Sequence, residues 1–136
     1  MRDSNGRRAL LIAMVVTVAS WLASGSVLFA QDLTAPSRVV DEYLVGLATG
    51  DTATLNSLID GPMKQKNRHL VLSPDTYAQF LRDHYAGVDM TVEDIVPAGD
   101  EMRARVRFDY PEEPSSVIEF ILSQTDGQWK ITDEVF

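Results

Sequence analysis

The side chains best suited to proton transfer in this chain are Asp133 and His84. Asp133 alternates with Trp129, Ile131 and Val135, and a strand with this pattern turns all four side chains to the same face. A carboxyl group on an apolar face must be paired or have its pKa raised, which suits an acid or a base. The rim of the sheet, where water would solvate the carboxylate, is the other position open to Asp133.

His84 lies between Asp83 and Tyr85 near the end of an expected helix. An imidazole exchanges protons near neutral pH, so His84 is the second candidate base. Adjacent helical residues point to different faces, however, and Asp83 is therefore not placed to orient His84. The helix dipole also favours a histidine in a last turn, which makes a structural role the simpler interpretation. The catalytic residues stay unassigned, with Asp133 and His84 as candidates.

The basic stretch 64–69 ends in the second histidine, His69. It could help to bind an anionic ligand or partner, and a solvated loop is the alternative. Neither His69 nor His84 has an acidic residue at a helical spacing typical of a zinc site. We therefore predict no metal and no cofactor.

Three arginines alternate along one expected strand and form a basic stripe on one of its faces. A tight turn at residues 111–114 would bring Arg107 near Glu119, and such cross-strand pairs contribute about 0.2–1 kcal/mol each. The face is either a solvated, salt-bridged surface or half of a homodimer or partner interface. That predicted partner surface consists of Arg103, Arg105, Arg107, Val117, Glu119 and Ile121.

The helices that must position these side chains come first in the chain. Apolar residues at spacings of three and four follow Pro36 and stop before Gly50, and Ser73-Pro74 is a typical helix start. Residues 63–72 fit either a helical turn or a loop. The predicted helices span residues 36–49, 52–59 and 74–85.

The period changes to two after Met90, which predicts strands at residues 91–96, 101–110, 116–125 and 128–135. Residues 116–125 are apolar on both faces, so this strand belongs in the middle of a sheet. Asp126-Gly127 is a two-residue hairpin signal. Helices followed by an antiparallel meander place the chain in the α+β class.

Residues 1–30 predict export. Arg2, Arg7 and Arg8 precede an uncharged, largely apolar run over residues 9–30, as in a signal peptide cut after Ala30. The run is also long enough for an uncleaved anchor. We predict a signal peptide or membrane anchor at 1–30, a linker at 31–35 and one domain at 36–136. A cleaved protein would be periplasmic or extracellular, and an uncleaved one would be anchored in the inner membrane.

Composition limits the partners of the exported part. The chain has no cysteine, so neither a disulfide nor a lipid-attachment cysteine is available. Removal of residues 1–30 takes away three arginines and Asp3, which leaves 9 basic and 19 acidic residues and a net charge of −10. Such a balance repels the phosphates of nucleic acids and of anionic lipids.

The chain resembles the nuclear transport factor 2-like (NTF2-like) superfamily, in its exported bacterial branch. The resemblance covers residues 36–136 and rests on Val39-Val40-Asp41-Glu42-Tyr43-Leu44, on Gly50-Asp51, and on Asp126-Gly127-Gln128-Trp129-Lys130-Ile131-Thr132-Asp133. It implies a curved sheet wrapped around the first helix as a cone, a pocket between them, and frequent dimerisation through the outer sheet face. Aromatic residues would then line the pocket: Tyr43, Tyr77, Phe80, Phe108, Phe120 and Trp129.

The superfamily includes ketosteroid isomerase, scytalone dehydratase and many binding domains without catalysis, so fold alone implies no activity. Our first hypothesis is an exported non-enzymatic domain that binds a small apolar ligand or an envelope protein. The second is an isomerase- or dehydratase-type enzyme with an acid or base in the pocket. The third is a structural dimer module.

Overall fold

The computed structural model describes residues 24–136, with side chains from Ala35 onward. The chain divides after Thr34 into two compact units, and the description below concerns the second, Ala35–Phe136. The three leader arginines and the apolar run up to residue 23 lie outside the described residues. In the part of the chain that is described, no helix is long and apolar enough to cross a membrane.

Helix α2, Ser24–Thr49, begins before its predicted start, so the expected linker at residues 31–35 is helical. Pro36 lies inside the helix and removes only one of its backbone hydrogen bonds, because a proline nitrogen carries no hydrogen. Beyond Pro36 the predicted apolar stripe is mostly buried. Its buried residues are Val40, Tyr43, Leu44 and Leu47, while Val39, also predicted in the stripe, is half-buried.

Four shorter helices follow: α3 Thr52–Ser57, α4 Pro62–Lys66, α5 His69–Leu72 and α6 Pro74–His84. The carboxylate of Asp51 caps α3, since it accepts hydrogen bonds from the Thr54 amide at 3.1 Å and the Thr54 hydroxyl at 2.7 Å. The region that the sequence left open, residues 63–72, is therefore mostly helical. The predicted third helix is confirmed as α6.

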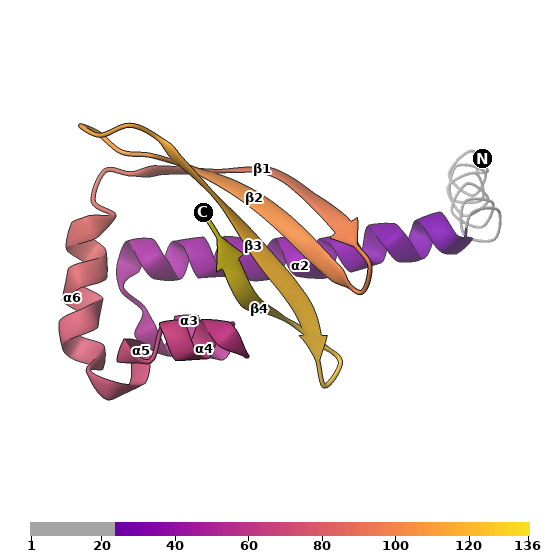
Figure 1. The fold of residues 1–136 in the computed structure, drawn as a ribbon, viewed down its shortest axis with the longest axis horizontal. Coiled ribbons are helices and arrows are strands. Elements are labelled where there is room, and N and C mark those ends of the chain that lie inside the picture. Colours follow the sequence, from indigo (N-terminus) through magenta and orange to yellow (C-terminus); the bar gives the residue numbers. More distant parts are fainter. Residues whose placement is uncertain (1–23) are drawn as a thin grey trace, which may run out of the picture. The chain divides into compact units, whose positions relative to one another are not determined.

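The strands are β1 Asp89–Ala98, β2 Glu101–Asp109, β3 Ser116–Thr125 and β4 Gln128–Val135. They form one antiparallel sheet in the order β1-β2-β3-β4, so β3 has a central position as predicted (Figure 1). The β3–β4 turn has positive φ at Asp126 (53°) and Gly127 (79°), the conformation that an Asp-Gly hairpin requires.

One face of the sheet forms the core with the helices. Figure 1 shows residues 35–49 of α2 running along the sheet and α6 standing across one end of it. Phe108 and Phe120, on β2 and β3, are 0% and 1% exposed. The rest of the buried inner face comprises Met102, Ala104, Val106, Ile118, Leu122 and Ile131. The α+β fold class is confirmed.

Two irregularities interrupt the ladder. In β1 the pairing shifts between Val92 and Asp94, and in β4 it shifts so that Leu122 faces Ile131 while Ile121 faces Asp133. An extra residue in one strand moves every side chain beyond it to the opposite face. The inner face of β4 therefore continues beyond Ile131 with Glu134, which pairs with Phe120.

The free edge of β4 is partly covered by the segment after α3. Ile59 and Ile131 form a parallel bridge. The Ile131 amide donates to the Leu58 carbonyl at 2.9 Å, and the Asp60 amide donates to the Ile131 carbonyl at 3.0 Å.

Candidate functional site

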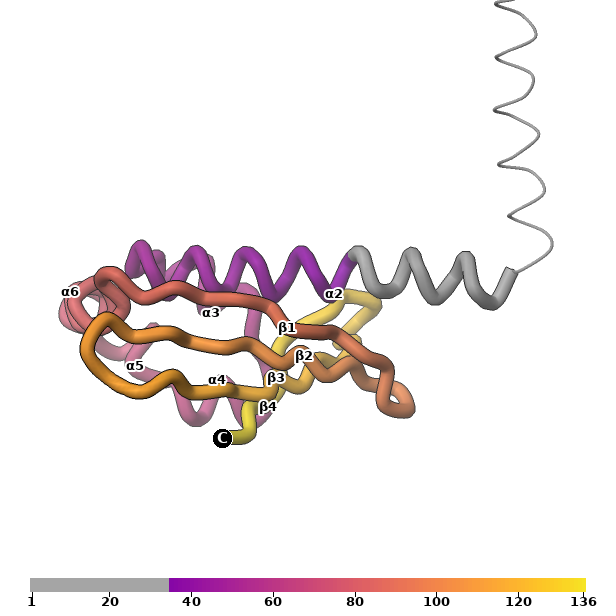
Figure 2. The backbone as a smooth tube through the Cα atoms, turned by 90° about the horizontal axis from the view of Figure 1, so that it is seen from above, coloured from indigo at the N-terminus to yellow at the C-terminus, as the bar shows by residue number. Residues whose placement is uncertain are grey.

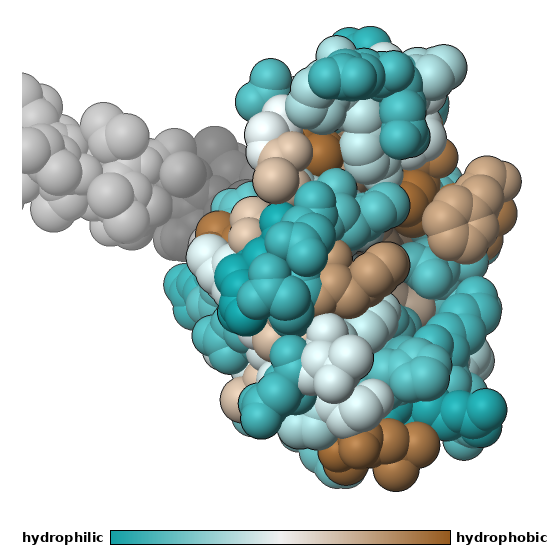
Figure 3. Space-filling view, turned by 90° about the vertical axis from the view of Figure 1, so that its left-hand side faces the viewer, coloured by the Kyte–Doolittle hydropathy of each residue, from teal (hydrophilic) through white to brown (hydrophobic). Residues whose placement is uncertain are grey.

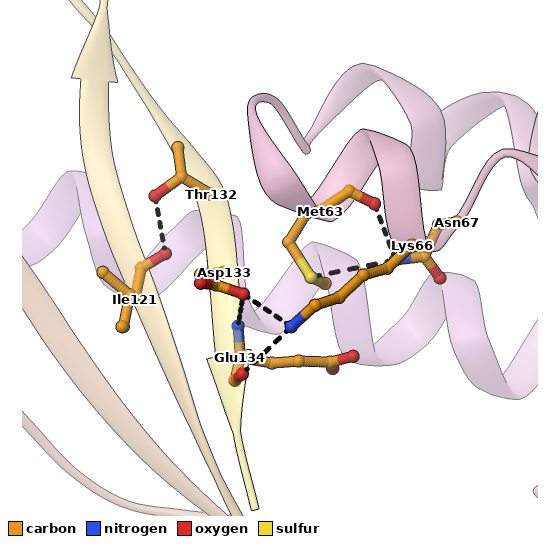
Figure 4. Close-up of polar contacts among 7 residues, drawn as sticks. All are labelled: Met63, Lys66, Asn67, Ile121, Thr132, Asp133 and Glu134. Carbon is orange, nitrogen blue, oxygen red and sulfur yellow. Dashed lines mark hydrogen bonds and ion pairs between the residues drawn. The ribbon is translucent and has the colours of Figure 1, made fainter.

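The irregularity in β4 decides where the candidate base Asp133 lies. Asp133 pairs with Ile121 rather than joining Ile131 on the inner face, and its side chain is 38% exposed. Lys66 of α4 donates from Nζ to Asp133 Oδ1 at 2.7 Å and to the Glu134 carbonyl at 3.4 Å (Figure 4). Of the two positions expected for Asp133, the structure shows the solvated rim and not the inner face, because the strand pairing changes just before this residue.

The ion pair also makes Asp133 a poor proton acceptor. The hydrogen bond from Lys66 and the bond that Asp133 accepts from the Glu134 amide lower the pKa of the Asp133 carboxyl. The hydrogen bond between Lys66 and Asp133 also raises the pKa of Lys66. Each partner holds the other in its charged form, which suits a link between α4 and β4 better than proton transfer.

Glu134 is the carboxylate that the fold turns toward the helices. Its side chain points from β4 to the helical side of the sheet, beside Lys66 (Figure 4). Burial raises the pKa of Glu134, and the charge of Asp133 adds to this effect while that of Lys66 opposes it. Among the described residues, the Glu134 carboxylate has neither an ion pair nor a side-chain hydrogen bond within the usual limits.

The charge of Glu134 acts on three tyrosines, and we call Tyr43, Tyr77, Tyr85 and Glu134 the tyrosine–glutamate cluster. Burial is the main cause of the raised pKa of Tyr43, and the nearby Glu134 charge is the second. The pKa values of Tyr77 and Tyr85 are raised in the same way, by burial first and by Glu134 among the other causes. The sequence missed Glu134 because strict alternation assigns it to the outer face.

The other candidate base, His84, lies on the exposed surface of α6. Its ring stacks on Phe80 with centroids 5.5 Å apart and meets Tyr85 edge-on at 4.7 Å. The carboxylate of Asp83 accepts a hydrogen bond from the Gln79 amide at 2.9 Å. His84 therefore belongs to an aromatic array rather than to a histidine–carboxylate pair.

A hollow lies between α5 and α6, which we call the α5–α6 groove. It has a volume of about 420 Å³ and is lined by His69, Ser73, Thr76, Tyr77 and Phe80. The Tyr77 and Phe80 rings stack at 5.7 Å with an interplanar angle of 15°, and Tyr77 also contacts the His69 ring at 5.7 Å. The groove is open to solvent and mainly aromatic, with hydroxyl groups on one side.

Exposed apolar side chains continue from this groove along α5. Val71 and Leu72 are 61% and 72% exposed, and Phe80 in the groove is 52% exposed. Figure 3 shows the side of the molecule that carries α5 and α6. Brown apolar areas lie between teal polar ones, and a brown patch lies at the lower end, where α5 is. Apolar patches of this kind are typical of binding surfaces.

The six aromatic residues of the predicted pocket do not lie together. Tyr43, Phe108 and Phe120 are packed in the core, with the Tyr43 ring edge-on to Phe120 at 5.5 Å. Trp129 lies beside the β3–β4 turn and pairs with Gln124. The remaining two, Tyr77 and Phe80, line the α5–α6 groove. Ser73 and Thr76 share this helix face, and their spacing from Tyr77 and Phe80 was the signal available in the sequence.

The predicted partner surface lies on the outer face of the sheet and carries cross-strand ion pairs. Arg103 bonds Glu119 at 3.0 Å, while Arg105 and Arg107 lie 3.8 Å and 3.5 Å from Glu93. The expected proximity of Arg107 and Glu119 is wrong. The connection between β2 and β3 is longer than a tight turn, so Arg107 pairs with Val117 and Arg105 with Glu119. Val117 is 40% exposed, and Ile121 is half-buried.

Comparison with known proteins gives likeness in structure only. The sequence matches no family model and no curated protein. An NTF2-like protein of unknown function from Shewanella baltica is 14% identical, with a TM-score of 0.56 over 78% of this chain and 92% of that one. Another from Silicibacter pomeroyi is 16% identical, with a TM-score of 0.54 over 79% and 95%.

A third solved structure is a Campylobacter jejuni protein whose name proposes an NTF2-like transpeptidase. It is 19% identical, with a TM-score of 0.50 over 71% of this chain and 96% of that one. At these identities the three likenesses concern the fold and not the chemistry.

Proposed function

Because this chain has the NTF2-like fold, we propose that it is an exported, non-enzymatic module that binds a small apolar ligand in the α5–α6 groove. The observation that carries the proposal is the stack of the exposed Phe80 ring on the half-buried Tyr77 ring, at the wall of a hollow of about 420 Å³. Ligand sites typically have volumes of about 300–1,000 Å³, with apolar and aromatic walls and a few polar groups. An envelope protein that inserts an apolar side chain is the alternative occupant.

The groove supplies both kinds of contact that such a ligand needs. Phe80 is 52% exposed, so a ligand that covers its ring removes apolar surface from water. Ser73 and Thr76, on the same helix face, can donate or accept hydrogen bonds, and His69 adds a further polar group.

The test is binding of a neutral fluorescent probe, N-phenyl-1-naphthylamine. Replacing Phe80 by alanine should weaken binding about two- to tenfold, since an aromatic pair contributes about 0.5–1.5 kcal/mol. Val117→Ala is the matched control, because Val117 is also an exposed apolar residue (40%) but lies on the outer sheet face. Equal affinities for the two variants would refute the α5–α6 groove as the site.

Export is part of the proposal and has its own test. Mass spectrometry of protein purified from the cell envelope should give a mature N-terminus near residue 31 if the leader is cleaved. An intact leader in the membrane fraction would support an anchor instead. Recovery of the full-length chain from the cytosol alone would contradict export. The same preparation reveals any ligand that co-purifies.

Acid–base catalysis is a second candidate function, because burial raises the pKa of Glu134 on the helical side of the sheet and its charge acts on the three tyrosines of the tyrosine–glutamate cluster. Glu134 takes the role that Asp133 cannot, since Asp133 is held by Lys66. With a co-purified ligand in hand, Glu134→Gln should retain binding and lose chemical conversion, whereas Asp133→Asn should retain both. Conversion that survives in Glu134→Gln would exclude Glu134 as the base.

We also propose a homodimer through the outer sheet face. Val117 and Val135 are 40% and 47% exposed beside the ion pairs of that face. Sedimentation velocity over a range of concentrations should show a dimer that Val117→Asp weakens. A strict monomer at all concentrations would contradict this arrangement.

A further inference from the structure

The sheet has an unpaired edge at β1. The strand order places β1 first, and nine of its ten residues pair with β2 on one side. Within residues 35–136, no strand pairs with the other side. An edge strand offers its outward backbone N–H and C=O groups to any extended segment that can lie beside it.

An apolar hollow lies directly next to this edge, and we call it the α2–β1 groove. Its volume is about 390 Å³. Its walls come from α2 and from the start of β1 with the residue before it: Asp41, Leu44, Val45, Ala48, Val88, Asp89 and Met90. Seen from above, residues 35–49 of α2 run alongside β1, at the edge of the sheet (Figure 2). Val45 is 62% exposed, although it lies among apolar neighbours.

The surroundings of Val45 are acidic. Asp41 and Val45 also line a second hollow of about 250 Å³, together with Glu42 and Asp51. The two hollows are lined by four carboxylates and by no basic side chain. An apolar partner that also carries positive charge complements this surface, whereas an acidic one is repelled.

We propose that the β1 edge and the α2–β1 groove bind an extended peptide in which apolar and basic residues alternate, and that the peptide adds to the sheet as a fifth strand. In this arrangement the peptide backbone pairs with β1. Its apolar side chains fill the groove over Val45, and its basic side chains face the carboxylates at the rim. The site is separate from the α5–α6 groove and does not depend on the function proposed for it.

The irregularity in β1 limits the length of the added strand. The ladder shifts between Val92 and Asp94, and Pro97 has no amide hydrogen to offer. The regular part of the edge is therefore Asp89, Met90, Thr91 and Val92, which lies next to the groove. We expect a peptide segment of about four to six residues to be sufficient.

The experiment uses an acetylated and amidated synthetic hexapeptide of alternating lysine and valine, with an alternating glutamate–valine peptide as its counterpart. Affinity is measured by calorimetry at low salt. The basic peptide should bind and the acidic peptide should not. Asp41→Lys should weaken binding about fivefold or more, while Glu112→Lys, an exposed acid in the β2–β3 connection, should change it less than twofold.

Amide hydrogen exchange tests the strand addition itself. The bound peptide should slow the exchange of β1 amides within residues 89–92, because a new strand covers them. The same peptide with alternate backbone nitrogens methylated should lose binding, although its side chains are unchanged. Equal binding of the acidic peptide, or binding without protection of β1, would overturn the proposal. Phe80→Ala should leave the peptide affinity unchanged, which separates this site from the α5–α6 groove.

Discussion

Replacement of Gly50 by alanine should destabilise the protein more than the same replacement at Gly99. Both glycines have positive φ, 70° and 65°, so both variants incur the strain of a left-handed residue, about 1–2 kcal/mol. A Cβ atom at Gly50 would lie 2.6 Å from the Ala78 carbonyl oxygen of α6, whereas a Cβ at Gly99 meets nothing within 4 Å. Overpacking against a backbone atom adds about 1–3 kcal/mol, because either α2 or α6 must move.

Urea unfolding followed by circular dichroism measures the difference. With a slope of about 1–3 kcal/mol per molar urea, Gly50→Ala should unfold at a midpoint about 1 M below that of Gly99→Ala. The slopes should match the wild type if both variants keep the fold. Equal midpoints for the two variants would show that the Ala78 carbonyl of α6 does not lie against Gly50.

Three further changes test the core and the two carboxylates of β4. Phe120→Ala, at a residue 1% exposed, should lower the free energy of unfolding by about 3–5 kcal/mol in urea titrations, and a loss under 1 kcal/mol would contradict a packed inner face. The lowered pKa of Asp133 stabilises the fold above the unfolded pKa of this carboxyl, and this contribution disappears as the pH falls through the folded value. Asp133→Asn should therefore flatten the loss of stability in acid, seen in melting temperatures from about pH 2 to 7, and an unchanged profile would argue against the Lys66 pair. The raised pKa of Glu134 has the opposite sign, because stability falls as the pH rises from the unfolded to the folded value of this carboxyl. Glu134→Gln should remove that fall and melt no lower than the wild type at neutral pH, whereas a clear drop there would show that the carboxylate is paired.

Local backbone rules predicted most of the fold. A two-residue hairpin turn requires positive φ at both of its central residues. Aspartate followed by glycine adopts this conformation readily, and Asp126 and Gly127 have it here. Ser73-Pro74 marks the start of α6 for a similar reason, since proline is tolerated in the first turn of a helix. Alternation over residues 101–110 and 116–125 then placed β2 and β3 within one residue of their observed bounds.

The candidate site was less predictable because it depends on pairing between strands. The shift in β4 inserts one residue without any glycine or proline to signal it, and so alternation put Asp133 inside and Glu134 outside. The partner of Arg107 depends on the length of the β2–β3 connection rather than on Arg107 itself. Alternation correctly put Phe108 and Phe120 on the inner face, but it could not tell a filled core from an open pocket.

The bridge between Ile59 and Ile131 makes the two edges of the sheet unequal. One edge is occupied by the chain's own segment at residues 58–60, while the other pairs with no strand among residues 35–136 and carries Asp89, Glu93 and Asp94. A sheet with two open edges can polymerise head to tail, but contact between two copies through β1 alone is two-fold symmetric and ends at a pair. Like charges on β1 oppose even that pair. Pairing between strand edges alone therefore ends at two copies and does not grow into a fibre.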